Sequence, residues 1–270
     1  MPTADHFTGY LASILSDQQN SIDLTKDVFV VYDSIGAWSA PRVWWMLKVF
    51  GAANAFILNG GLCGWISEGY EVETTPFRQK SPRSSPEVIG VSFNKALIRT
   101  YDAIQRIVRS NSDSCLLIDA RPSGRFLGLD PEPRADVASG HIAGSRNVPW
   151  KSVLISHRLQ RDRGTLSGCL SGNEGELIEY EYFTYNSREK LEELFSEKLN
   201  LPPNHDKELI FTCGSGEQVS CNTIPHIIPS GVSAVVVLVA TMVSEYCNWD
   251  NVSLYDGSWT EWNLREAGKL

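Results

Sequence analysis

The sequence predicts an α/β fold, in which a parallel sheet is flanked by helices, built as two tandem copies of which the first is incomplete. Two observations predict it. Short β-branched strands alternate with apolar helical stretches, the order that parallel strands require because each pair needs a crossover connection. One pattern of strand, helix, second strand, small-residue turn and tryptophan also occurs twice within the 270 residues, which indicates a duplication.

The first copy lies within the first 70 residues. A β-branched run at 28–32 (VFVVY) predicts a buried strand. Residues 39–50 predict a helix with Pro41 in its first turn and a glycine after its end. The run at 55–58 (AFIL) predicts a second strand, and a glycine turn follows it.

A polar, proline-rich stretch at 71–90 predicts a linker. It separates a partial first domain, 1–70, from a second domain, 91–270, in which the alternation of strands and helices is repeated. The elements predicted there are a helix at 96–108, strands at 115–118 and 209–212, a helix at 232–247 and a strand at 252–255.

The two copies differ at the residue that ends the repeated strand. Asp33 in the first copy parallels Cys213 in the second, and the glycine turn before Trp65 parallels Asp256-Gly257-Ser258 before Trp262. Ligands of open parallel sheets bind at the carboxyl ends of the strands. Only the second copy therefore presents a nucleophile at that position.

Composition and charge exclude several functions. The formal net charge of −8 provides no positive field for a nucleic acid. The six cysteines have neither a CxxC pair nor a histidine at zinc-finger spacing, so reduced thiols are expected rather than a metal site or a disulfide framework. No targeting segment is visible at the N-terminus. The apolar run 232–243 is too short for a bilayer, which takes about 20 helical residues, so no membrane partner is expected.

The loop Cys213-Gly214-Ser215-Gly216 directly follows a predicted strand. Its glycines allow successive N–H groups to point inward, and such a nest stabilises a thiolate or a bound anion. Ser215 adds a hydroxyl donor. The loop therefore predicts a reactive Cys213. Taken alone, it is equally compatible with an inert buried cysteine beside an ordinary glycine turn.

The segments around this loop resemble the catalytic domain of the rhodanese-type sulfurtransferases. The first 70 residues resemble the later part of the non-catalytic first domain of that family. Within the family the CGSG form is similar to the 3-mercaptopyruvate sulfurtransferases, whereas members that prefer thiosulfate usually carry a more basic loop. The matching segments are Asp119-Ala120-Arg121, Gly124-Arg125-Phe126, Pro131-Glu132-Pro133-Arg134, 139–145 (SGHIAGS), Asn147-Val148-Pro149, CGSG and 255–262 (YDGSWTEW).

The resemblance implies a rhodanese-like sheet and sulfur transfer without a metal or an organic cofactor. The Cys213 thiolate would take the sulfane sulfur of 3-mercaptopyruvate, or of thiosulfate, as a persulfide. It would pass this sulfur to a thiol acceptor, such as thioredoxin or a small thiol, or to cyanide. The resemblance also implies a cytoplasmic or mitochondrial protein.

The same resemblance implies roles for individual residues. Arg125 and Arg134 match the positions that hold the substrate carboxylate and carbonyl, a role that suits a guanidinium fork. Ser215 is implied in catalysis with Cys213, and Gly214 and Gly216 in substrate binding. His141 and Asp119 are expected to be structural.

The chain departs from the family directly after the loop. Family members continue from CGSG into a helix, whereas here the predicted helix begins at Val232 and follows a 15-residue insert, 217–231. The effect of a helix terminus on an anion fades within about one turn. We therefore expect the insert to slow sulfur transfer. Cys221 and His226 within it are not expected to form a catalytic pair, because no third group orients them.

The first copy also lacks a strand and a GHI-like motif before residue 28. In the family that part supplies an aspartate and a histidine to the cleft, so Ser215 is expected to lack these partners. The alternative function is a catalytically impaired isoform or a binding module with a tryptophan-rich surface. A cysteine phosphatase is a weaker alternative, because its loop ends in an arginine that CGSGEQ lacks.

Overall fold

The computed structural model describes residues 2–15, 21–36, 38–73, 86–110, 112–162, 177–202, 205–214, 247, 249 and 251–270. The chain forms two compact units. The Cys213 unit comprises Met1–Pro2, Asn94–Val153 and Asn186–Leu270, and the Asp33 unit comprises Thr3–Phe93 and Leu154–Tyr185. No helix among the described residues is long and apolar enough to span a bilayer.

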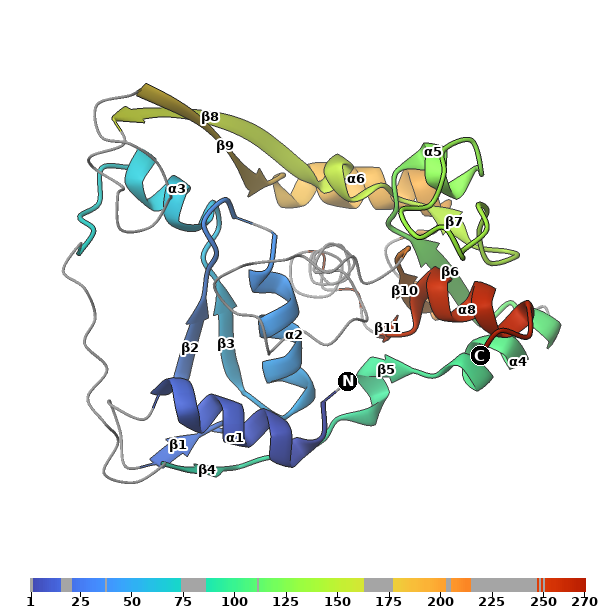
Figure 1. Ribbon diagram of the computed structural model, residues 1–270, viewed down its shortest axis with the longest axis horizontal. Helices are drawn as coiled ribbons and strands as arrows, with labels where there is room; N and C mark the ends of the chain where they lie inside the picture. Colours follow the sequence, from blue (N-terminus) through green and yellow to red (C-terminus); the bar gives the residue numbers. More distant parts are fainter. Residues whose placement is uncertain are drawn as a thin grey trace. The chain divides into compact units, whose positions relative to one another are not determined.

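A five-stranded parallel sheet forms the centre of the Cys213 unit (Figure 1). Its strand order is β5-β11-β10-β6-β7, so the strand that precedes Cys213 lies in the middle. The register pairs Thr212 at the end of β10 with Asp119 at the end of β6. The strands are β5 (Ile98–Arg99), β6 (Cys115–Asp119), β7 (Arg146–Asn147), β10 (Glu208–Thr212) and β11 (Val252–Tyr255).

Two helices cover one face of this sheet. Ile104 of α4 and Trp259 and Trp262 of α8 share one buried cluster with Leu117 and Ile210 of the central strands. Such apolar burial is the main favourable term for holding helices on a sheet. The helical elements are η1 (Lys95–Leu97), α4 (Tyr101–Ser110), α5 (Ser123–Phe126), η2 (Trp150–Val153), α6 (Arg188–Leu199) and α8 (Ser258–Glu266).

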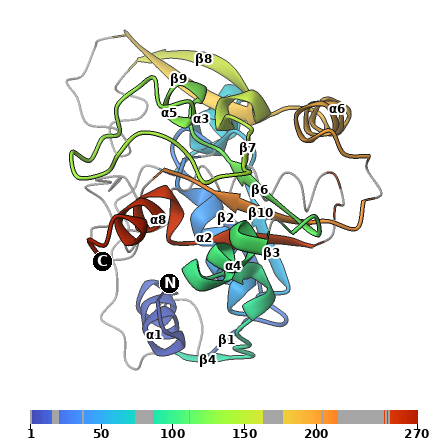
Figure 2. The same ribbon diagram turned by 90° about the vertical axis from the view of Figure 1, so that its right-hand side faces the viewer.

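The described residues of the Asp33 unit form three two-stranded sheets. β1 pairs with β4 and β2 with β3, both in parallel, whereas β8 and β9 form a long antiparallel ribbon (Figure 2). The elements are α1 (Ala4–Leu15), β1 (Ser21–Asp23), β2 (Val28–Val31), α2 (Ala40–Val49), β3 (Asn54–Ile57), α3 (Gly61–Ser67), β4 (Glu87–Ile89), β8 (Leu154–Asp162) and β9 (Leu177–Tyr185).

The β8–β9 ribbon packs on α3. Cys63 and Ile66 of α3 form a buried cluster with Leu159 and Tyr182 of the ribbon. The backbone N–H of Phe183 also donates to the Ile35 carbonyl at 2.8 Å. The ribbon comes from the range 91–270 that the sequence assigns to the second domain, yet its contacts place it in the Asp33 unit. The boundaries 1–70, 71–90 and 91–270 stay a proposal.

The alternating α/β fold with its parallel sheet is confirmed, and three sequence expectations need correction. The strand at 28–32 is not buried, because Val28 is 66% exposed and Val30 58% exposed. The expected tryptophan-rich surface is reduced to Trp65, which is 39% exposed, because Trp44 and Trp45 are both buried in α2. The helix at 96–108 begins later, at Tyr101, because Ile98 and its neighbour pair with β11 as β5.

Candidate active site

Cys213 lies at the carboxyl end of the central strand, and the start of α8 holds its backbone. The Trp259 N–H donates to the Cys213 carbonyl at 2.8 Å. The Thr260 N–H donates to the Gly214 carbonyl at 2.9 Å, and the Thr260 hydroxyl donates to the same oxygen at 2.8 Å. The Cys213 residue is only 7% exposed. These bonds fix the first two residues of the CGSG loop against a rigid helix.

The same turn recurs in the Asp33 unit. There the Leu62 N–H donates to the Asp33 carbonyl at 2.9 Å, and the Cys63 N–H donates to the Ser34 carbonyl at 3.0 Å. Leu62 and Cys63 are the second and third residues of α3, just as Trp259 and Thr260 are in α8. The structure therefore confirms that Asp33 and Cys213 occupy equivalent positions in the two copies.

In the Asp33 unit the side chain at this position is a carboxylate, that of Asp33 itself. Asp33 Oδ2 accepts hydrogen bonds from the backbone N–H groups of Trp38, Ser39 and Ala40, at 2.8, 2.8 and 3.0 Å. The N–H groups at the start of a helix are well suited to bind negative charge, and α2 begins at Ala40. The first copy thus fills with its own carboxylate the place where the second copy carries a thiol.

Removing the Asp33 carboxylate is expected to loosen the start of α2. In Asp33→Ala we expect a loss of roughly 2 kcal/mol in the local stability of that helix, because three N–H groups lose a charged acceptor. Hydrogen exchange of the peptide containing Ala40 measures this loss as faster exchange. Asp33→Asn, which retains one side-chain oxygen as acceptor, should fall between the wild type and the alanine variant. Equal exchange in all three proteins would contradict the prediction.

Arg125 lies directly against the Cys213 loop. A Cβ atom added to Gly214 would overlap the Arg125 guanidinium and would lie 2.5 Å from Cδ of Arg121. Glycine is therefore required at 214 because two arginine side chains occupy the space beside it. The structure places the predicted residues Cys213, Gly214 and Arg125 together.

Glu132 connects the two arginines. Its Oε1 accepts from Arg121 Nη1 at 2.7 Å, and its Oε2 accepts from Arg125 Nη2 at 2.5 Å. Arg125 Nε also donates to Oε1, at 3.3 Å. The Glu132 side chain is only 1% exposed, whereas that of Arg125 is 17% exposed. A buried carboxylate therefore holds one edge of the Arg125 guanidinium in a fixed orientation.

Arg121 completes the network below the loop. It is 1% exposed and forms a bidentate pair with Asp119, with Nη2 at 2.6 Å and Nε at 3.0 Å from Oδ2. Its guanidinium carbon lies 5.2 Å from the ring centre of Trp259, the residue that binds the Cys213 carbonyl. Asp119 thus has the structural role expected of it. His141 packs on Phe126: its Nδ1 lies 2.7 Å from the Phe126 carbonyl oxygen, and its ring stacks on the Phe126 ring with the centroids 4.0 Å apart.

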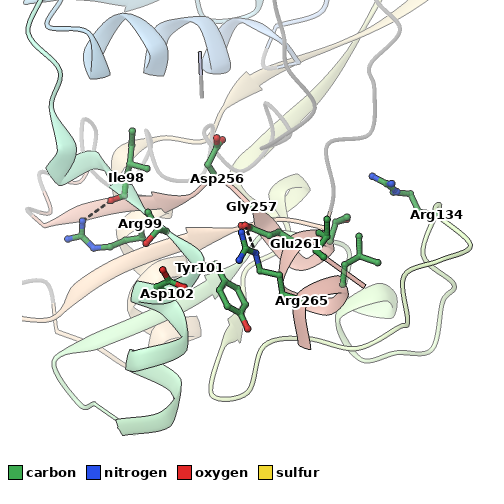
Figure 3. Close-up of a pocket in the computed structure, with 13 residues that line it drawn as sticks. Ile98, Arg99, Tyr101, Asp102, Arg134, Asp256, Gly257, Glu261 and Arg265 are labelled. Carbon is green, nitrogen blue, oxygen red and sulfur yellow. Dashed lines mark hydrogen bonds and ion pairs between the residues drawn. The ribbon is translucent and has the colours of Figure 1, made fainter. Parts of the chain in front are cut away.

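Arg134 has a different environment from Arg125. It lines a cavity of about 640 Å³ at the carboxyl ends of β5 and β11 (Figure 3). Its ion-pair partner is Asp136, at 3.5 Å, and both side chains are about half exposed. In Figure 3 it stands apart from the other labelled arginines of the cavity, Arg99 and Arg265. Thr260 lines the same cavity and binds Gly214, so the cavity adjoins the Cys213 loop.

Several predicted features lie outside the described residues. These are Ser215 and Gly216 of the loop, the insert 217–231 with Cys221 and His226, and all but the last residue of the helix expected at 232–247.

Two other thiols of the described chain are poor nucleophiles. Burial raises the pKa of Cys63, and the nearby Asp33 carboxylate adds to this. Burial, together with the nearby Glu192 carboxylate, raises the pKa of Cys247 to about 11. Both thiols stay protonated near neutral pH, and a thiol reacts as its thiolate. They are therefore weak competitors of Cys213 in any labelling experiment.

Comparison with known proteins identifies the family. The rhodanese-like domain matches residues 102–265, which include every described residue of the network around Cys213. The chain belongs to the rhodanese family. Relatives match nearly its full length, and the expected parallel sheet flanked by helices agrees with the fold of the solved structures that it matches.

Two curated rhodanese-family relatives have the same identity to this chain. Thiosulfate sulfurtransferase of Rattus norvegicus is 30% identical over 269 residues, which are 98% of this chain and 70% of the relative. 3-Mercaptopyruvate sulfurtransferase of the same organism is 30% identical over 267 residues, with the same two shares. The crystal structure of the Tum1 protein from Saccharomyces cerevisiae has a TM-score of 0.67 and 27% identity, and the match covers 99% of this chain and 74% of that one.

Sequence reasoning missed one residue of this site. Glu132 stands in a segment that matches the family, but nothing in that segment shows that it pairs with Arg121 and Arg125.

Proposed function

We propose that this rhodanese-family protein is a sulfurtransferase that carries sulfane sulfur on Cys213. With 3-mercaptopyruvate, the thiolate attacks the donor sulfur, the carbon–sulfur bond breaks, and pyruvate leaves after its enolate takes up a proton. The product on the enzyme is a Cys213 persulfide. An acceptor thiolate, or cyanide, then attacks the outer sulfur and releases the Cys213 thiolate. The relatives named above, which are sulfurtransferases, support this proposal.

The observation that carries the proposal is the position of the Arg125 guanidinium against the Cys213 loop. Both candidate donors are anions, a carboxylate in 3-mercaptopyruvate and a dianion in thiosulfate. Because Glu132 already holds the Arg125 guanidinium in place, binding such an anion does not cost the conformational entropy of ordering this side chain. We assign Arg125 to donor binding. We assign Arg134, which lines the adjoining cavity, to binding either the donor or the acceptor thiol. Ser215 and Gly216 complete the proposed site.

Cys213→Ser is expected to abolish sulfur transfer. Purified protein is incubated with 3-mercaptopyruvate and a small thiol, and pyruvate release is followed; thiosulfate and cyanide are tested in parallel. We expect the rate of pyruvate release by the variant to be lower by at least about 1,000-fold, since the nucleophile is lost. Cys115→Ser is the matched control, because Cys115 lies at the opposite end of the sheet, at the start of β6, and this variant should retain full activity. Equal pyruvate release by wild type and Cys213→Ser would refute the proposal.

The second candidate function is a binding module on a catalytically impaired scaffold. The observation that favours it is the exposed apolar surface of β2 and β3, on which Val30 and Phe56 are register partners, 58% and 55% exposed. Exposed apolar patches mark interaction sites. A wild-type protein that releases pyruvate no faster than Cys213→Ser, and forms no persulfide, would favour this second function.

A further inference from the structure

One face of the β2–β3 pair is open to solvent. Val28, Val30 and Tyr32 alternate along β2 and the residue after it, so their side chains point to the same side of the sheet. Phe56 of β3 is the register partner of Val30 (Figure 1). The exposed fractions of these four residues, here called the β2–β3 patch, are 66%, 58%, 58% and 55% in chain order. Contiguous apolar patches on a protein surface mark interaction sites.

The Cys213 unit shows what covers the same face in the other copy. Because Asp33 corresponds to Cys213, Val30 corresponds to Ile210, the third residue before it in each case. Ile210 is fully buried, and it shares a cluster with Ile104 of α4, which is also fully buried. An amphipathic helix therefore closes this face of the sheet in the Cys213 unit.

The described part of the Asp33 unit has no helix in the place of α4. α2 packs on the opposite face, toward which the buried side chain of Ala55 points. α3 corresponds to α8, and its Trp65 corresponds to Trp262, which shares the cluster of Ile210. Trp65 is 39% exposed, however, whereas Trp262 is 9% exposed. The tryptophan has been kept, but the helix that would pack beside it is not among the described residues.

The segment that follows α3 adds negative charge beside Trp65. The indole N–H of Trp65 donates to the Glu71 carbonyl at 2.9 Å, which holds this segment against the tryptophan. Glu68, Glu71 and Glu73 are all exposed there. The sequence has no lysine or arginine between residues 49 and 77 to balance them. Charge complementarity therefore favours a basic partner at this surface.

We propose that the β2–β3 patch binds a basic amphipathic helix of a partner protein. The apolar side of this helix would cover Val30 and Phe56 as α4 covers Ile210, and its basic side chains would face the acidic segment after α3. α4 itself has this character, because its exposed residues include Arg106 and Arg109. The inference gives the second candidate function a class of partner. It does not depend on sulfur transfer, because every residue of the patch belongs to the Asp33 unit.

Fluorescence anisotropy with a labelled helical peptide tests this proposal. The probe is the segment 99–110 of this chain, which contains α4, with a covalent staple on its polar side that leaves both arginines in place. The staple is needed because so short a peptide is marginally helical by itself. Val30→Glu and Phe56→Glu should each weaken binding at least about tenfold, since each places a charge in an apolar contact. Replacing both arginines of the probe by glutamate should also weaken binding, most strongly at low ionic strength.

Ile14→Glu is the matched control. Ile14 is an exposed apolar residue of the same unit, 52% exposed on α1, and this variant should bind the probe as wild type does. All three substituted residues are exposed, so each variant should keep the circular dichroism spectrum and the denaturant midpoint of wild type. Equal affinity in wild type and both patch variants, or no binding at about 1 mM probe, would overturn the proposal.

Sedimentation velocity distinguishes a partner helix from a second copy of this chain. A wild-type dimer that Val30→Glu dissociates would also overturn the proposal, because the patch would then be covered by another copy. Pyruvate release is measured on the same variants and should equal that of wild type. Loss of probe binding with full pyruvate release sustains the inference. A protein that binds the probe at the patch but transfers no sulfur would sustain it as well, and would refute only the proposed sulfur transfer.

Discussion

Glu132→Ala is expected to destabilise the Cys213 unit by roughly 3–5 kcal/mol and to remove most sulfur transfer. In the wild type, two guanidinium groups, Arg121 and Arg125, are balanced by two carboxylates, Asp119 and Glu132. Loss of Glu132 leaves one positive charge unbalanced around Arg121, whose side chain is fully buried. Removing one partner of a buried pair costs much more than the pair contributes in net terms, because the remaining charge stays desolvated.

The expected catalytic defect in this variant has a separate cause. Arg125 would lose both of its bonds to Glu132, so that its guanidinium is no longer held against Gly214. Glu132→Gln separates the two effects, because glutamine keeps the shape and one acceptor oxygen but not the charge. We expect Glu132→Gln to remain folded at low temperature, with a higher KM for the anionic donor. The measurements are the denaturant midpoint of unfolding and the donor dependence of pyruvate release.

Asp136→Asn is the matched control for this experiment. Asp136 also pairs with an arginine, Arg134, but at 3.5 Å and with both side chains about half exposed. Such exposed pairs contribute about 0–1 kcal/mol, so stability should change little. If Glu132→Ala unfolded at the same denaturant concentration as Asp136→Asn, the central role of Glu132 in the buried network would be refuted.

The regular elements of the parallel sheets could be predicted from the sequence because their signals are local. Strands β6, β10 and β11 lie within one residue of the expected runs at 115–118, 209–212 and 252–255. Each is a short apolar stretch bounded by polar or turn residues. The sequence analysis missed the β8–β9 ribbon. Its first strand, LISHRLQRD, is too polar to suggest a buried strand, whereas the strand-forming residues of LIEYEYFTY in β9 were a signal that was available.

The site was predictable only in part, for a related reason. Cys213 and Gly214 could be identified because a glycine loop that follows a strand is itself a local pattern. Glu132 derives its role from Arg121 and Arg125, which precede it by 11 and 7 residues. Burial decides whether such an acidic side chain is a solvated surface group or part of a network, and the local sequence does not record burial. The exposure of Val30 follows from what covers β2 in three dimensions, which the pattern VFVVY does not record.

Deleting residues 217–231 is expected to raise the rate of persulfide formation roughly 100-fold. This is the factor by which a rate falls when one hydrogen-bond donor is removed from an oxyanion hole. The deletion joins Gly216 to Val232 and restores CGSGVSAVVV, a loop followed directly by the predicted helix. The insert lies outside the described residues, but the equivalent junction of the first copy shows what a helix start contributes. There the start of α2 supplies three N–H groups to the Asp33 carboxylate.

The insert separates Cys213 from the corresponding helix start by 15 additional residues. Pro225 and Pro229 within it lack an N–H, so they can neither extend the helix nor replace its donors. Persulfide formation is measured as the mass of the Cys213 peptide after brief exposure to 3-mercaptopyruvate. A variant in which 217–231 is replaced by a glycine-serine segment of equal length distinguishes length from sequence. It should react as slowly as the full chain. Equal rates in the full chain and the deletion would show that the loop binds the anion without its helix, and that the insert is accommodated at no cost to the chemistry.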